Sequence, residues 1–121
     1  MKRIRLMAAG ALVGLVGCAA AQPVPVSDAD LNAKLGAGAQ AEFMAGGQKG
    51  VMTFFADRTV SREMGNSGQI DDGTWRVADG KLCITWKTPA APEACMTQMK
   101  VGSSYEARGA DGSVAMAYTL K

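Results

Sequence analysis

Apolar and polar residues alternate in short segments from about residue 40 onward, and turn residues interrupt the alternation at intervals of about 8 to 12 positions. A period of two places successive side chains on opposite faces of a strand. Pairs such as Asp79-Gly80 and Gly102-Ser103 supply the backbone conformations of tight hairpins. The pattern predicts strands near residues 41–45, 50–56, 59–64, 69–78 (bent at Gly73), 81–87, 94–101, 104–108 and 113–120.

These connections are all short, so neighbouring strands are expected to be antiparallel. The predicted fold class is mainly β: an antiparallel meander that forms a small barrel or half-barrel. No repeat and no second domain are evident, and residues 27–121 are expected to form a single β-rich domain.

One short helix is predicted before the strands. Ser27 is suited to cap it, and Asp28 and Asp30 fall in its first turn, where the helix dipole favours negative charge. Leu31 and Leu35 lie one turn apart on one face. So short a helix is marginal alone in water, and this apolar face is expected to pack on the strands that follow.

The N-terminal segment has the pattern of a secretion signal. Lys2, Arg3 and Arg5 precede an uncharged, apolar stretch over residues 6–16. A membrane-spanning helix needs roughly 20 apolar residues, whereas the apolar part of a signal peptide needs only about 7 to 15. Residues 1–17 are therefore predicted to be a signal peptide.

The sequence Leu15-Val16-Gly17-Cys18 resembles the lipobox of bacterial lipoproteins. The resemblance implies that Cys18 receives a diacylglycerol and becomes the first residue of the mature chain. Ala19 follows the cysteine in place of Asp, which in Gram-negative lipoproteins implies the outer membrane, with the domain facing the periplasm. An ordinary signal peptide cut after the Ala-x-Ala-like site Ala19-Ala20-Ala21, leaving a soluble secreted protein, is the alternative.

Residues 18–26 are expected to form the lipidated N-terminus and a stalk. Pro23 and Pro25 favour an extended stretch that holds the domain away from the lipid surface.

Cys83 and Cys95 remain once Cys18 is assigned to the anchor. An even pair in an oxidising compartment favours a disulfide over two free thiols or a metal site. If the two cysteines face each other across a hairpin, Leu82 faces Met96 and Ile84 faces Ala94. The hairpin would then place the cysteines on one sheet face and these apolar residues on the other.

Charge and composition exclude several functions. Three of the thirteen basic residues lie within residues 1–17, so the remaining chain carries ten basic against eleven acidic side chains, and no nucleic-acid partner is expected. The chain has no histidine, which excludes a Ser-His-Asp triad, a Cys-His pair and a histidine metal site. We therefore expect no enzymatic activity, no catalytic residue, no metal and no cofactor.

Two weak site patterns have ordinary structural explanations. Met96 and Met99 suggest a Cu(I) site, but residues three apart in a strand point to opposite faces, and methionine commonly fills gaps in small cores. Asp71-Asp72-Gly73 suggests a carboxylate pair or a calcium site, yet no EF-hand spacing is present and Asp-Gly favours turns. Asp71 and Asp72 also interrupt a strand-like run just before Trp75.

Trp75, Trp86 and Tyr105 are the candidate binding residues, because aromatic side chains often anchor interfaces. Core positions for the two tryptophans are the alternative. Gly73-Thr74-Trp75 resembles the Gly-x-Trp of lipocalins, although lipocalins carry it near the N-terminus. The order Gly-x-Trp, Leu-Cys-x-x-Trp, Cys and Tyr, over 73–105, also resembles short proteobacterial envelope proteins without an assigned function, which implies a secreted β-rich domain with a disulfide.

The expected function is that of a non-enzymatic envelope lipoprotein. Its partners would be the membrane, through the lipid anchor, and another envelope component, either a protein or a glycan. Two alternatives stay open: a calycin-like carrier of a small apolar ligand inside the barrel, and an inhibitor similar to the small lipoprotein inhibitors of lysozyme. These inhibitors carry a C-terminal Ser-Gly-x-x-Tyr motif, which residues 102–105 match poorly.

Overall fold

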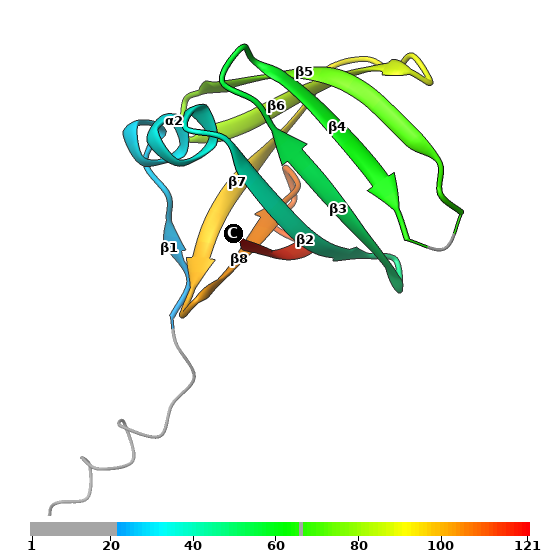
Figure 1. Cartoon of the computed structure of the whole chain (residues 1–121). Helices are drawn as coiled ribbons and strands as arrows, with labels where there is room; N and C mark the ends of the chain where they lie inside the picture. Colours follow the sequence, from blue (N-terminus) through cyan, green and yellow to red (C-terminus); the bar gives the residue numbers. More distant parts are fainter. Residues whose placement is uncertain (1–21, 66) are drawn as a thin grey trace, which may run out of the picture.

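The computed structural model describes residues 22–65 and 67–121, and its strands form a closed antiparallel barrel (Figure 1). Each barrel strand pairs with the next in the chain, and β9 returns to pair with β2. The predicted meander is confirmed, and it closes fully. The barrel strands are β2 (Ala39–Ala45), β3 (Gln48–Phe54), β4 (Thr59–Met64), β5 (Ile70–Ala78), β6 (Lys81–Thr88), β7 (Ala94–Val101), β8 (Ser104–Arg108) and β9 (Val114–Leu120).

Turn residues end these strands within one residue of the prediction, except that β3, predicted over 50–56, lies over Gln48–Phe54. Asp79 and Gly80 adopt φ angles of 55° and 76°, and Gly102 adopts 64°, which are left-handed conformations suited to tight hairpins. The predicted bend in β5 is also present, because the pairing register with β6 shifts between Asp72 and Gly73.

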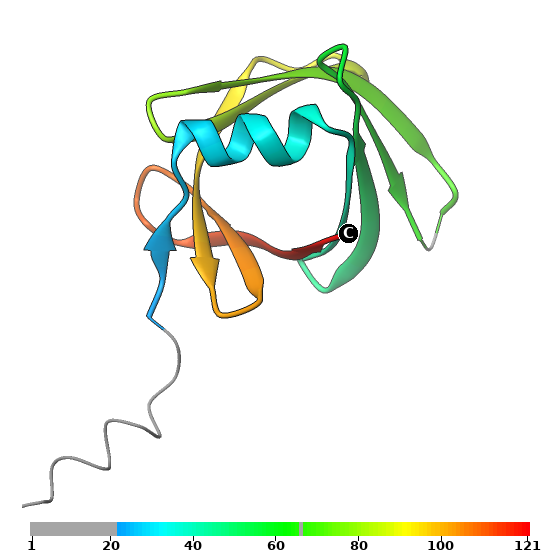
Figure 2. The ribbon, with the colours of Figure 1, turned by 60° about the vertical axis from the view of Figure 1, so that its left-hand side comes forward.

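The predicted helix is present as α2 (Asp28–Gly36), which lies across one end of the barrel (Figure 2). The Ser27 side chain accepts a hydrogen bond from the backbone N–H of Asp30 at 3.1 Å, as expected of a cap. Leu31 and Leu35 are both 2% exposed, so the apolar face packs on the barrel as predicted. The β3–β4, β5–β6 and β7–β8 turns share this helix-covered end, and the other four turns lie at the far end.

The expected stalk needs correction at residues 24–26. β1 (Val24–Pro25) pairs with β7, and the Val26 N–H donates to the Gln98 carbonyl oxygen at 3.0 Å. The physical reason is that β6 pairs with β7 only as far as Thr97, which leaves the last backbone groups of β7 in need of partners on that side. The folded domain therefore begins earlier than residue 27.

Residues 1–21, including the predicted signal peptide and Cys18, lie outside the described residues. Within the described part of the chain, no helix is long and apolar enough to cross a membrane.

Candidate functional site

The barrel encloses a cavity of about 120 Å³. Its lining runs from Leu35 of α2, at the helix-covered end, to Trp86 and Arg62 nearer the far end. Most of the lining side chains are apolar, and its polar members are Arg62, Gln98 and Tyr118. A small apolar space with a few convergent polar groups is the usual form of a small-molecule site.

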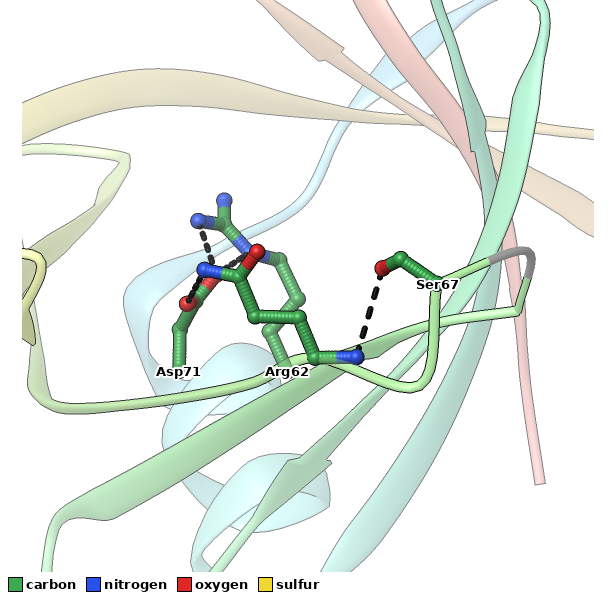
Figure 3. A network of polar contacts seen from close by, with 4 residues as sticks. Arg62, Ser67 and Asp71 are labelled. Carbon is green, nitrogen blue, oxygen red and sulfur yellow. Dashed lines mark hydrogen bonds and ion pairs between the residues drawn. The ribbon is translucent and has the colours of Figure 1, made fainter.

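An ion pair inside the barrel joins β4 to β5 (Figure 3). Arg62 and Asp71 are cross-strand partners, and the Nε and Nη2 atoms of Arg62 donate to Oδ2 of Asp71 at 2.9 and 2.6 Å. The Gln69 side chain donates to the other carboxylate oxygen, Oδ1, at 3.0 Å. Asp71 is only 3% exposed, so these donors provide the compensation that a buried carboxylate requires.

Gly73 makes room for Trp86 beside this ion pair. A side chain on Gly73 would approach the Thr85 carbonyl oxygen to 2.5 Å and the Trp86 ring to 3.0 Å. Without it, the indole packs across β5, and the Arg62 guanidinium lies 4.2 Å from the ring centroid. This cation–π contact fixes Arg62 from a second side.

A second polar pair lies deeper in the barrel. The Tyr118 hydroxyl donates to Oε1 of Gln98 at 2.5 Å, and Nε2 of Gln98 donates to the Met96 carbonyl oxygen at 3.0 Å. The Tyr118 ring stacks on Tyr105 with centroids 5.3 Å apart. Burial, and to a lesser degree the neighbouring Tyr105, raise the pKa of Tyr118 above its ordinary value of 10.0, so its hydroxyl keeps its proton further into the alkaline range than an exposed tyrosine does.

The disulfide between Cys83 and Cys95 is present, in the predicted register. Leu82 faces Met96 and Ile84 faces Ala94.

A bidentate ion pair flanks the disulfide on the outer surface. Two nitrogens of Arg76 donate to the two carboxylate oxygens of Glu93, each at 2.7 Å, and this bond lowers the pKa of Glu93 and raises that of Arg76. Glu93 and the two cysteines form a compact group of metal-ligating atoms, but both sulfurs are already bonded to each other.

The three candidate binding residues do not form one site. Trp75 is buried at the helix-covered end, where its indole N–H donates to the Phe55 carbonyl oxygen at 3.1 Å. Tyr105 is buried behind Tyr118. Only Trp86 lines the cavity.

Sequence reasoning missed the Arg62–Asp71 pair and the Gln98–Tyr118 pair. The period of two carries a usable signal for the first, because Arg62 alternates in phase with buried Val60 and Asp71 with buried Trp75. Two opposite charges on the inward faces of adjacent predicted strands indicate an internal ion pair. Gln98 and Tyr118 lie on strands separated by β8, and the sequence has no local pattern that joins them.

Comparisons of the chain with protein families, with curated proteins and with solved structures found no match.

Proposed function

We propose that this protein is a non-enzymatic lipoprotein of the bacterial envelope that binds one small, mainly apolar molecule inside its barrel. The membrane anchor is Cys18, and the domain faces the periplasm from the outer membrane. The observation that carries the binding proposal is the cavity between α2 and Trp86.

The size of the cavity limits its ligand. Drug-sized ligands occupy roughly 300 to 1,000 Å³, whereas an apolar protein cavity of about 150 Å³ holds benzene. A space of about 120 Å³ therefore suits a single compact molecule near the size of one ring and excludes a lipid chain.

Cavity-filling variants test the binding proposal. Ala107 lines the cavity and is 4% exposed, so Ala107→Met should fill part of the space. Ala115→Met, on the exposed surface of β9, is the matched control. We expect phenol or toluene, titrated into the ¹⁵N-labelled domain, to shift amide resonances of cavity residues in wild type and Ala115→Met, and at least tenfold less readily in Ala107→Met. Binding of neither probe to wild type, or equal binding to both variants, would contradict the proposal.

A separate experiment tests the anchor. Cells that express the full chain should incorporate labelled palmitate into the wild-type protein and not into Cys18→Ser. The variant should also leave the membrane fraction. Palmitate labelling of Cys18→Ser would show that Cys18 is not the lipidation site.

The second candidate function is the docking of another envelope component, a protein or a glycan, on the outside of the barrel. A hollow of about 580 Å³ over β2, β3 and β9 favours it, with Glu42, Lys49 and Glu63 among the lining residues. A stoichiometric protein captured from solubilised envelope, and lost in Lys49→Glu, would support this candidate. Co-purification of a small molecule alone would support the cavity.

A further inference from the structure

Gln98 and Tyr118 form a polar contact in the wall of the otherwise largely apolar cavity. Gln98 is 2% exposed and Tyr118 is 8% exposed, and both side chains line the cavity. The two residues come from β7 and β9, the strands that flank β8, so their side chains meet across β8 inside the barrel.

This pair has one hydrogen-bond donor and one acceptor group that it does not use internally. The Gln98 amide has two donor hydrogens, and one bonds to the Met96 carbonyl oxygen. The Tyr118 hydroxyl uses its single hydrogen on Gln98 and keeps acceptor lone pairs. Within residues 22–65 and 67–121, the second amide hydrogen and these lone pairs have no hydrogen-bond partner. Buried polar groups are usually satisfied, so the pair favours a ligand that supplies both a donor and an acceptor.

Arg62, the third polar residue of the cavity lining, does not favour a charged ligand. The Arg62 guanidinium is paired with Asp71, so their formal charges cancel. An additional ionised group inside the barrel would bear the cost of burial without an opposite charge.

We propose that the ligand is an uncharged, single-ring-sized molecule with one hydroxyl group, which accepts a hydrogen bond from Nε2 of Gln98 and donates one to the Tyr118 oxygen. This inference rests on the proposed function of the cavity and specifies the chemistry of its ligand. Phenol-like and small alicyclic alcohols belong to this class. A site built to bond a hydroxyl discriminates against the analogue that lacks it, because its own polar groups then stay unpaired.

Phenol, toluene and benzoate test the proposal on the unmodified domain. Phenol and toluene have nearly the same shape and differ in the hydroxyl, whereas benzoate adds a charge. We expect phenol to bind about tenfold more tightly than toluene, the factor that one net hydrogen bond supplies, and benzoate to bind more weakly than phenol. Dissociation constants come from the chemical-shift titration, at pH 7, where phenol is neutral.

Two matched variants test whether the Tyr118 hydroxyl causes the preference for phenol over toluene. Tyr118→Phe should reduce the preference for phenol over toluene severalfold, whereas Tyr105→Phe, the same change on the stacked neighbour outside the cavity lining, should retain it. Gln98→Met, measured in the same way, provides the second test if Tyr118→Phe does not fold.

The outcomes separate the two proposals. Equal binding of phenol and toluene, or tighter binding of benzoate, would overturn the hydroxyl proposal while the cavity still functions as a binding site. Binding of none of the three would overturn both.

Discussion

The two ends of the barrel are built from the same strands but differ in what fills them. At the helix-covered end, Leu31 and Leu35 of α2 and the edge-to-face pair of Phe54 and Trp75, with ring centroids 6.0 Å apart, form an apolar core. Leu35 and Phe54 also border the cavity from this end. Toward the far end, the interior holds the Arg62–Asp71 ion pair and half-buried Trp86. The first kind of filling stabilises the fold through buried apolar area. The second contributes less stability and leaves space, which is what a binding site requires.

The two tryptophans provide the sharpest test of this difference. Trp75→Ala should lower the free energy of unfolding by about 4 kcal/mol, because it removes a fully buried aromatic ring and leaves a cavity. Trp86→Ala should lower the free energy of unfolding clearly less, since the indole already borders a cavity and is only partly buried. Urea denaturation followed by circular dichroism measures both, and equal losses would show that the two ends are packed alike.

Removal of the disulfide should weaken the far half of the barrel, where the β6–β7 connection lies. The bond closes a loop with a sequence separation of 12 residues, and the double variant Cys83→Ser, Cys95→Ser should lose up to about 3 kcal/mol on the chain-entropy account. Thermal unfolding of the oxidised wild type and the double variant measures the loss. Arg76→Gln, which removes the neighbouring exposed ion pair, is the control and should change the midpoint little.

The helix cap makes a smaller contribution at the helix-covered end. Ser27→Ala removes the acceptor of the Asp30 N–H and should cost about 1 kcal/mol. Ser27→Asp, which keeps an acceptor, should retain most of the stability. A loss of equal size in both variants, measured by urea denaturation, would show that the cap does not act through this hydrogen bond.

The smallest expected effect is on the pH dependence of stability, and it arises from one aspartate in a turn at each end of the barrel. Asp57 in the β3–β4 turn and Asp111 in the β8–β9 turn each accept two hydrogen bonds from the residue two positions later, Thr59 and Ser113 respectively, and these bonds lower both carboxyl pKa values below 3.8. A lowered pKa contributes stability above the unfolded-state pKa, and that contribution is lost as the pH falls through the folded-state value. Carboxyl ¹³C shifts between pH 2 and pH 6 measure it.

Thr59→Ala and Ser113→Ala should each raise the pKa of the aspartate in their own turn only. A change in the other turn would mean that the two ends are coupled.

The strand boundaries were predictable because each depends on local chemistry. The predicted ranges 59–64, 94–101 and 104–108 match β4, β7 and β8, since glycine or aspartate turns bound these segments and a proline-containing loop precedes β7. The disulfide register followed from two cysteines in one hairpin.

The polar pairs and the cavity inside the barrel were not predictable from local sequence. Pairing of Arg62 with Asp71 depends on the register of two strands, and the Gln98–Tyr118 bond depends on the registers of three, β7, β8 and β9. The cavity is the volume that all the inward side chains leave unfilled, and no single segment encodes it. The prolines correctly indicated an extended chain at β1. They carry no information about which strand that chain pairs with, so the pairing with β7 was missed.

The seam between β2 and β9 has a consequence for how the chain folds. Every other pairing within the barrel joins strands that follow one another, whereas this seam joins Ala41 to Leu120 and Phe43 to Tyr118. Local hairpins form quickly, and the entropy of closing a long loop rises only with the logarithm of its length. The conformational search therefore reduces to a series of short-range steps and a single long-range closure. Gln98 and Tyr118 both lie within the consecutive strands β7, β8 and β9, so their polar pair can assemble in a local three-stranded meander before the seam closes.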